Sequence, residues 1–317
     1  MKALTYLTIL LLLLPAVSCK YKQKSTTEKV NEEAFASEMV NFVPYEKNPV
    51  FKGTGTDTWD KQIRERGYII FEGGIYKMWY TGYNGSDTVP KYLGYATSGD
   101  GIHWTRYPKN PVFTKKWTED MFVVKNEGTY YMFAEGRNDV AHALVSDDGI
   151  HWLEEGDLDI RTTKGASVPG PYGTPVVWIE NGKWYLFYER NDEAIWLARS
   201  NDRKTWINVF DEPIIKPGPE KYDAGAIAAN QIVKHKGKYY MYYHGSSNPD
   251  WASQASSTAW TSNVAMSTDL IHWIKYPQNP IVKGDHSSPI TVFDGERYRL
   301  YTMHPEVCLY FAKTKIK

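Results

Sequence analysis

The sequence predicts an all-β protein, a five-bladed β-propeller with four-stranded blades whose ring is closed by an N-terminal strand. A unit of short strands separated by tight turns recurs five times in register, which is the signature of a repeat architecture. The last copy lacks its fourth strand, and a matching strand stands near the other end of the chain. The alternatives, a β-sandwich or two small β-domains, do not account for five copies in register.

The first residues form a processing signal rather than part of the fold. Lys2 precedes an apolar run over residues 3–14, which is too short for a membrane span and typical of a secretory signal. Pro15-Ala16-Val17-Ser18 leads into Cys19, and small residues before a Cys resemble a bacterial lipobox. We therefore expect a signal peptide over 1–18, lipidation of Cys19, a flexible tether over 19–37 and the propeller over 38–317. Ordinary signal cleavage with an incidental Cys is the alternative.

The predicted lipid anchor indicates that the protein is located in the bacterial cell envelope. The residues after Cys19 are basic and lack an acidic stretch of the kind associated with surface export. This favours the periplasmic side of the outer membrane over the cell surface. Cys308 is the one other cysteine, so a lipidated Cys19 leaves it unpaired and the mature fold has no internal disulfide. We expect a monomer.

The second copy of the repeat, Asp120 to Trp152, sets the register for the others. Its runs of β-branched and aromatic residues are separated by turns at Asn126-Glu127-Gly128 and Asp148-Gly149, which are hairpin signals. Counting back from the middle strand of each copy gives the starts of the five inner strands. They are Arg66, Asp120, Thr174, Asn230 and Ser288, at offsets of 54, 54, 56 and 58 residues.

The third strands end in a repeated turn with a Ser, an Asp two residues on and a Trp six residues on. The copies are 98–104, 146–152, 200–206 and 267–273. The Asp is expected to accept hydrogen bonds from turn amides, and the Trp to pack between neighbouring sheets. His103, His151 and His272 repeat with this turn, so we interpret them as hairpin residues and not as catalytic ones.

A fourth strand is predicted after several of these hairpins. The segments are Asn110–Phe113, Glu212–Ile215 and Asn279–Val282, each with a Pro that an edge strand tolerates. The segment that would complete the last copy is Asn48–Phe51, near the N-terminal end. It predicts closure of the ring by an N-terminal strand.

Composition and motifs exclude several classes of function. The formal net charge is zero, so a basic face for nucleic acid is not indicated. No Cys/His cluster has zinc-ligand spacing and no Gly-rich loop has the form of a phosphate cradle. We therefore expect no cofactor and no metal, and a central ion stays open. The 12 Trp and 24 Tyr suit both β-strands and sugar-binding surfaces.

Two rings of side chains are expected at the central funnel, one from the inner-strand starts and one from the ends of the middle strands. The second ring carries Glu135, Glu189, His244 and His304. Glycoside cleavage needs one carboxyl to protonate the leaving oxygen and another to act as base or nucleophile. Asp120, Glu135 and Glu189 are the catalytic candidates, with Asp120 as base or tuning group and either Glu as acid. Structural ion pairs between blades are the alternative for each.

The remaining polar positions of the two rings, together with polar residues next to them and one upstream of them, are candidates for substrate binding, with structural ion pairs or hydrogen bonds as the alternative. They are Glu65, Arg66, Arg137, Thr174, Arg190, Asp223, Asn230, His244, Ser288 and His304. Four arginines, Arg64, Arg66, Arg137 and Arg190, also offer charges that would suit phosphate.

Several segments resemble the five-bladed propeller glycoside hydrolases of families 43, 32 and 117 and their family 130 phosphorylase relatives. They include GGIYKMWYTGY, YATSGDGIHWTRYPKNPVF, EGTYYMFAEG, ENGKWYLFYER and GKYYMYYHG. The resemblance implies hydrolysis of arabinose-, xylose-, fructose- or galactose-type linkages, or phosphorolysis of mannosides. Family 43 has carboxylates at the first three inner-strand starts. Here Arg66 and Thr174 replace two of them, and only Asp120 carries over.

The sequence thus predicts a secreted lipoprotein glycosidase that acts on the ends of plant or algal oligo- or polysaccharides, because a funnel closed at one end admits chain termini. A non-catalytic glycan-binding lipoprotein on the same fold is the second hypothesis, motivated by Arg66 and Thr174. A glycoside phosphorylase is the third, and phosphate-dependent turnover would mark it.

Overall fold

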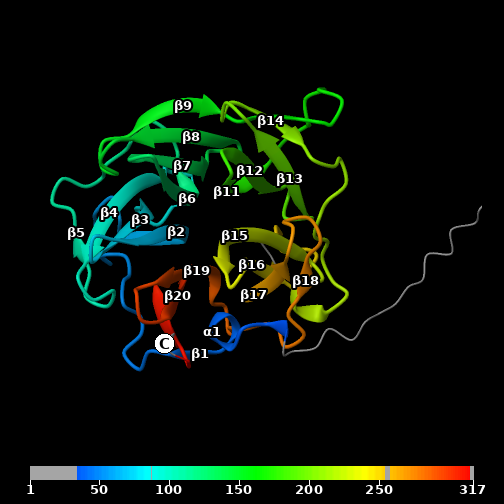
Figure 1. Ribbon diagram of the computed structural model, residues 1–317. Coiled ribbons are helices and arrows are strands. Elements are labelled where there is room, and N and C mark those ends of the chain that lie inside the picture. The colour runs from blue at the N-terminus through cyan, green and yellow to red at the C-terminus, as the bar shows by residue number, and fades with distance from the viewer. Residues whose placement is uncertain (1–33, 87, 254–257, 315–317) are drawn as a thin grey trace, which may run out of the picture. The chain divides into compact units, whose positions relative to one another are not determined.

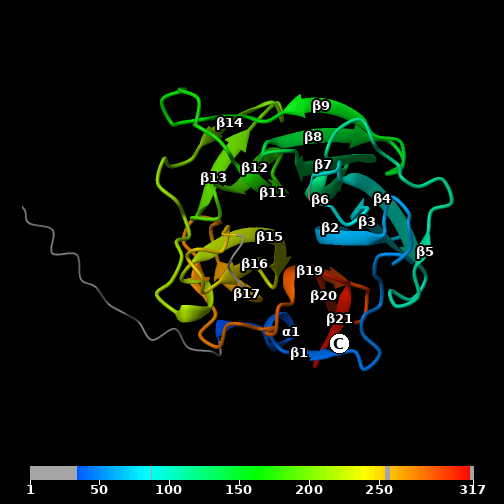
Figure 2. The same cartoon turned by 180° about the vertical axis from the view of Figure 1, so that it is seen from behind.

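Five β-sheets, each built from one copy of the repeat, surround a common centre and form a five-bladed propeller (Figures 1 and 2). The computed structural model describes residues 34–86, 88–253 and 258–314. The predicted signal peptide and Cys19 lie outside them. The all-β, five-bladed prediction is confirmed, because strands make up almost every element of the described chain.

The strands follow the order that the repeat predicts. The first blade is β2 (Gln62–Glu72), β3 (Ile75–Tyr83), β4 (Tyr92–Ser98) and β5 (Thr105–Arg106). The second is β6 (Glu119–Asn126), β7 (Thr129–Glu135), β8 (Ala141–Ser146) and β9 (Leu153–Asp157). The third is β11 (Gly173–Glu180), β12 (Lys183–Glu189), β13 (Ile195–Ser200) and β14 (Thr205–Asn208), extended by β10 (Asp159–Arg161). The third blade therefore has five strands, one more than predicted, because β10 pairs parallel to β14.

The last two blades contain the remaining strands. The fourth is β15 (Ala226–His235), β16 (Lys238–Ser246), β17 (Trp260–Ser267) and β18 (Ile274–Lys275). The fifth is β19 (Ser287–Phe293), β20 (Tyr298–His304), β21 (Cys308–Ala312) and β1 (Phe42–Pro44). Two short helices, α1 (Ser37–Val40) and η2 (Lys221–Asp223), complete the described elements. None of the described helices is long and apolar enough to cross a membrane.

The ring is closed by an N-terminal strand, as predicted, but at a different place. The closing strand is β1, in which Phe42 lies opposite Ala312 of β21. The predicted segment Asn48–Phe51 makes a single bridge, from Phe51 to Val307. Its Asn48 side chain pairs with the main chain of Leu309, donating to the carbonyl at 2.9 Å and accepting from the N–H at 2.7 Å. The side-chain amide of Asn48 thus makes the two hydrogen bonds that a strand residue would make to Leu309, so no strand is needed at this point.

The same correction applies to the fourth strands of the other blades. Asn110 and Asn279 each hydrogen-bond both main-chain groups of one third-strand residue, Tyr95 and Val264 respectively, at 2.9–3.0 Å. The predicted segments make single bridges through their last residues, while β5, β14 and β18 form just before them. A side-chain amide carries a donor and an acceptor, and it can therefore imitate a strand.

The repeat places one large apolar side chain at the middle of every blade. Its position is the third residue of the middle-strand motif, and it is fully buried in all five copies, as Met78, Met132, Leu186, Met241 and Leu300. Burying such a side chain stabilises the fold by roughly 1.5–3 kcal/mol. The predicted turn also forms, since Asp148 accepts from the amides of Ile150 and His151 at 2.8 Å. Its Trp152 ring packs edge-on against Trp79 of the preceding blade.

The far ends of the inner strands carry ion pairs between blades. Glu72 at the end of β2 accepts from Lys125 of β6, and Glu180 at the end of β11 accepts from Lys234 of β15, both at 2.5 Å. Inter-blade ion pairs were the structural alternative for Glu135 and Glu189. The fold uses other carboxylates for that purpose.

The described chain is already packed at Phe35, within the range 19–37 predicted as a tether. The Phe35 ring lies against Tyr240 and Tyr276. Glu38 of α1 is buried and accepts from His235 at 2.8 Å and from Lys236 at 2.6 Å. These two residues lie at the β15–β16 turn, at the opposite end of the inner strand from Ala226, so the N-terminal segment docks there.

Candidate functional site

Each of the five inner strands has a backbone irregularity at its predicted start, either a shift in pairing register, a left-handed residue, or both. The pairing of β2, β6, β11 and β15 with their middle strands shifts register at the predicted strand starts. Four of the five starts have left-handed backbone, with φ of 53° at Arg66, 51° at Asp120, 46° at Thr174 and 58° at Ser288. Such a conformation costs a non-Gly residue on the order of 1–3 kcal/mol and concentrates at functional sites. A β-bulge also changes the direction in which the side chain of the bulged residue points.

The strand starts and the ends of the middle strands meet because each pair is an antiparallel hairpin. Glu119 lies opposite Glu135, Gly173 opposite Glu189, and Ala228 opposite His244. A cavity of about 110 Å³ lies where they converge. It is lined by Arg64, Arg66, Asp120, Glu135, Asp139, Glu189, Asn191, Asp192, His244, Trp251, Trp260, Ser287 and Ser288.

Arg66 connects three blades at the floor of this cavity. Its guanidinium donates through Nη2 to Asp120 Oδ2 at 2.7 Å and through Nη1 to the hydroxyl of Thr174. Burial alone would lower the pKa of Arg66, but the charges of Asp120, Glu135 and Asp192 outweigh burial and raise it. Arg66 is therefore a permanent cation that stabilises Asp120 as a carboxylate.

The carboxyls of Glu135 and Glu189 converge on Gly173. A Cβ at that position would lie 2.0 Å from Glu135 Oε2 and 2.6 Å from Glu189 Oε1, so only glycine leaves room for both. The Thr174 amide donates to Glu135 Oε2 at 3.1 Å, and its hydroxyl lies 3.5 Å from Glu189 Oε1. The Asp192 amide donates to the other oxygen of Glu189 at 2.5 Å. The two carboxyls form one unit.

The pKa values of both carboxyls are raised above the ordinary range of a glutamate. Asp120, Glu135 and Glu189 are only 4%, 7% and 4% exposed. Burial raises the pKa of Glu189 to about 8, with the Asp192 charge adding to the effect. Burial, followed by the Asp120 charge, raises the pKa of Glu135 well above its ordinary value. A buried carboxyl with a raised pKa beside an ionised one is the arrangement of an acid–base pair.

His244 is held on the opposite wall. Its Nδ1 is 3.3 Å from Asn230 Oδ1, its Nε2 is 3.6 Å from Asp192 Oδ1, and its ring packs edge-on against Trp260 at 5.0 Å. With Nδ1 donating to Asn230, Nε2 faces Asp192 and the cavity. The predicted ring residue Asn230 therefore acts through His244 and does not itself line the cavity.

Like Asn230, several other predicted binding residues do not line the cavity. Arg137 is exposed and faces a separate surface hollow, and the Arg190 guanidinium lies over the Trp196 ring at 5.3 Å. His304 Nε2 is 4.0 Å from Asp285 at the fifth blade. Glu65 belongs to β2, and its side chain lies outside what the structure describes. Thr174 reaches the site through its contacts with Arg66 and both glutamates.

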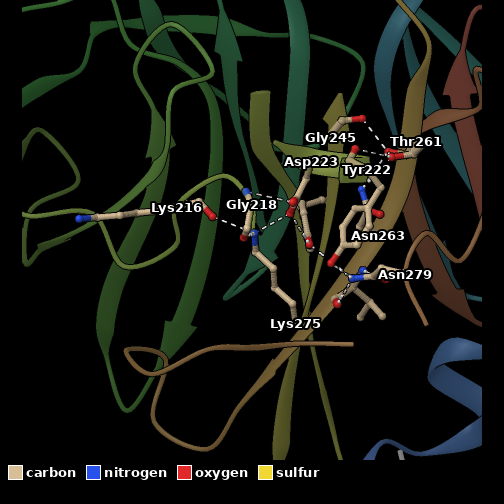
Figure 3. Close-up of polar contacts among 11 residues, drawn as sticks. Lys216, Gly218, Tyr222, Asp223, Gly245, Thr261, Asn263, Lys275 and Asn279 are labelled. Atoms are coloured by element: carbon tan, nitrogen blue, oxygen red, sulfur yellow. Dashed lines mark hydrogen bonds and ion pairs between the residues drawn. The ribbon is translucent and has the colours of Figure 1, made fainter. Parts of the chain in front are cut away.

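Asp223 also lies outside the cavity lining, and it belongs to a structural network (Figure 3). The fully buried carboxylate accepts from Lys275 Nζ at 2.6 Å, from Tyr243 at 3.0 Å and from the Gly218 amide at 3.1 Å. Asp60 repeats the arrangement in the first blade, accepting from Tyr80 at 3.1 Å and from Arg106 at 2.8 Å. Because the same kind of network occurs in two blades, we interpret it as a structural contact that joins hairpins.

The structure adds Asp192, Trp251, Trp260 and Ser287 to the cavity, none of which the sequence singled out. The signal for Asp192 was an Arg-Asn-Asp run at 137–139 and again at 190–192. In both copies the Asn and Asp have left-handed backbone, with φ of 50–62°. This turn sends the Arg outward and the Asp inward. Among the described residues, no group of three or more His, Cys, Asp or Glu could hold a metal ion.

Comparison with known proteins gives the same architecture. A glycosyl hydrolase from Bacteroides ovatus superposes with a TM-score of 0.71 over 88% of this chain and 96% of its own, at 17% identity. This is the fold of the five-bladed propeller glycoside hydrolases. A structure from the family 130 of mannoside phosphorylases, which contains hydrolases of β-1,2-mannosidic linkages in Candida mannan, matches with a TM-score of 0.67 and 16% identity, over 86% of this chain and 94% of its own.

Sequence comparison reaches the same group. A 1,2-β-oligomannan phosphorylase of Thermoanaerobacter sp. (strain X514) is 26% identical over 227 residues, covering 65% of this chain and 72% of its own. No family model matches the chain. The predicted resemblance to propeller glycoside hydrolases and their family 130 relatives is confirmed.

Proposed function

We propose that this protein is a glycan-active enzyme that cleaves a glycosidic bond in the central cavity. The observation that carries the proposal is the pair of buried glutamates with raised pKa values, Glu135 and Glu189, beside the Arg66-paired Asp120. The structural alternative, an ion pair exposed to solvent, would not require buried carboxyls with raised pKa values. Three buried carboxyls with one guanidinium among them supply both a proton donor and a base.

In the proposed reaction the glutamate pair is the general acid. One of the two carboxyls gives its proton to the glycosidic oxygen as the bond from that oxygen to the anomeric carbon breaks. Asp120 is the base, and it takes a proton from the water whose oxygen forms the new bond to the anomeric carbon. Arg66 keeps Asp120 ionised between turnovers, and the Thr174 amide and hydroxyl hold the glutamates.

Water is favoured over phosphate as the acceptor because the cavity is acidic. Five carboxyl residues line it against two arginines, and the three aspartates Asp120, Asp139 and Asp192 outnumber the arginines even when Glu135 and Glu189 hold protons. Both arginines are paired, Arg66 with Asp120 and Arg64 with Glu119 at 2.7 Å. A phosphate dianion would meet more negative than positive charge at this site. We therefore propose a hydrolase, and an exo-acting one, since the cavity is small.

The first substrates to test are β-1,2-linked manno-oligosaccharides, because phosphorylases of such linkages are among the relatives. Purified full-length protein in detergent would be incubated with these and with plant and algal oligosaccharides, with and without inorganic phosphate. Free monosaccharide without phosphate supports the hydrolase. Sugar phosphate formed only with phosphate indicates a phosphorylase. Binding with no release from any glycan would contradict the enzyme and favour a glycan-binding protein.

We further propose that Cys19, which lies outside the described residues, carries the lipid anchor and holds the enzyme at the periplasmic side of the outer membrane. The lipobox-like residues before Cys19 support this proposal. Cys19→Ala is expected to move the protein from the membrane fraction to the soluble fraction, because two or more acyl chains are lost. Cys308→Ala is the control and should stay with the membrane, since Cys308 is buried. An unchanged distribution of the Cys19 variant would rule the anchor out.

A further inference from the structure

Two tryptophans on the cavity wall have no part in the acid–base chemistry. Trp251 and Trp260 both line the cavity, with ring centroids 5.5 Å apart and planes at 69°. Both are half-buried, whereas the carboxyls of Asp120 and Glu189 are almost fully buried. The rings therefore stand nearer to solvent than the carboxyls, at the mouth of the cavity.

Trp251 lies within the longest of the five connections between a middle strand and the third strand, and Trp260 follows that connection directly as the first residue of β17. In the fourth blade it covers 247–259, while its counterparts cover 84–91, 136–140, 190–194 and 305–307. The other four connections have three to eight residues, which is enough to reverse the chain between two antiparallel strands. The longer one places Trp251 at the funnel and leads into Trp260, and long connections at such places commonly carry function.

The aromatic pair is held in place rather than left loose. The Trp260 amide donates to Asp285 Oδ1 at 3.0 Å. The Asn248 side chain ties the two arms of the connection together by donating to Thr258 Oγ1 at 3.0 Å, and it accepts from the Asp250 amide at 2.9 Å. The connection also packs on Gly225, where a Cβ would lie 2.3 Å from the main chain of Asn248. A fixed apolar surface loses little entropy when a ligand packs on it.

We propose that Trp251 and Trp260 form a second sugar subsite, an aromatic wall that packs against the apolar C–H face of the pyranose on the leaving-group side of the cleaved bond. This inference rests on the proposed function and specifies its substrate as an oligosaccharide with a sugar, not a small group, beyond the bond. An indole offers a large, rigid, partly apolar surface next to polar groups. The carboxyl floor then takes the terminal sugar, and the wall takes the next one.

The test compares an oligosaccharide with the glycosyl fluoride of the same terminal sugar, whose leaving group cannot reach the wall. Trp260→Ala and Trp251→Ala are expected to raise KM for the oligosaccharide roughly tenfold, while kcat/KM for the fluoride changes far less. Trp260→Phe should recover much of the loss. Asn248→Ala should give a smaller rise in KM, since it loosens the wall and keeps both rings. Phe210→Ala, an exposed aromatic residue outside the cavity, should leave both substrates unchanged.

If the tryptophan variants lose the same activity on both substrates, or lose none on either, the proposed aromatic wall is wrong, while the proposed hydrolase stands. If no glycan is turned over, calorimetric titration of the full-length protein with the oligosaccharide decides the matter. Weaker binding by Trp260→Ala then supports the wall and the proposed hydrolysis fails alone. Absence of oligosaccharide binding by the unmodified protein would overturn both.

Discussion

Replacing either Glu135 or Glu189 by Gln is expected to lower kcat at neutral pH by roughly 10²–10⁴-fold, the usual contribution of a general acid. The two carboxyls share the space over Gly173 and act as one proton-holding unit. The double variant is therefore expected to be little slower than either single variant, because groups that act together are not additive. Initial rates on a cleaved oligosaccharide measure all three.

The matched control is Glu180→Gln. It makes the same chemical change in a glutamate of the same fold that pairs with Lys234 far from the cavity. It should keep full activity. If both cavity variants also keep full activity on a cleaved substrate, the acid lies elsewhere and the site assignment is wrong.

The same pair predicts how stability changes with pH. The pKa of Glu189 is raised from an ordinary 4.5 to about 8, so the folded state binds this proton more tightly than the unfolded chain does. The resulting stabilisation is fully present below pH 4.5 and is lost as pH rises through 8. Activity is expected to fall over the same upper range, since the acid loses its proton. Chemical denaturation of the Glu189→Gln variant should show a smaller decline between pH 4.5 and 8 than the unmodified protein, because only the contribution of Glu135 is left.

The positions that repeat could be predicted from the sequence, because one register transfers to every blade. Counting residues was enough to bring Arg66, Asp120 and Ser288 to one cavity with Glu135 and Glu189. The count follows from hairpin pairing, in which a middle-strand end must lie opposite an inner-strand start. No side-chain detail is needed for that step.

The residues that lie in connections could not be predicted this way. Arg190 and Asp192 are two positions apart, and the sign of φ at Asn191 and Asp192 decides which of them faces the cavity. Trp251 lies inside the connection 247–259 and Trp260 begins β17 directly after it, and the longer connection has no equal in the other blades. The prediction of a strand at Asn48–Phe51 was wrong for a related reason. A side-chain amide can replace the hydrogen bonds of a strand without changing the pattern of apolar residues.

Arg66→Met is expected to destabilise the fold by about 3–5 kcal/mol, the usual cost of removing one partner from a buried ion pair. The guanidinium is the positive charge closest to Asp120, and its loss leaves buried carboxyls facing one another. Methionine has a similar length and packs without a charge. Chemical denaturation at pH 7 gives the change in unfolding free energy. Arg161→Met, which breaks a solvent-screened pair with Asp159, should cost far less than Arg66→Met.

A double-mutant cycle separates the charge of Arg66 from its packing. Asp120→Asn removes the negative partner with little change in shape, so Arg66→Met should cost much less in that background than in the unmodified protein. Equal costs in the two backgrounds would mean that Arg66 stabilises the fold through packing or through Thr174 alone. A large coupling would instead place Asp120 as the charged member of the site, because only an ionised carboxylate depends on the guanidinium. The stability of the fold and the ionisation that the proposed reaction needs would then rest on the same contact.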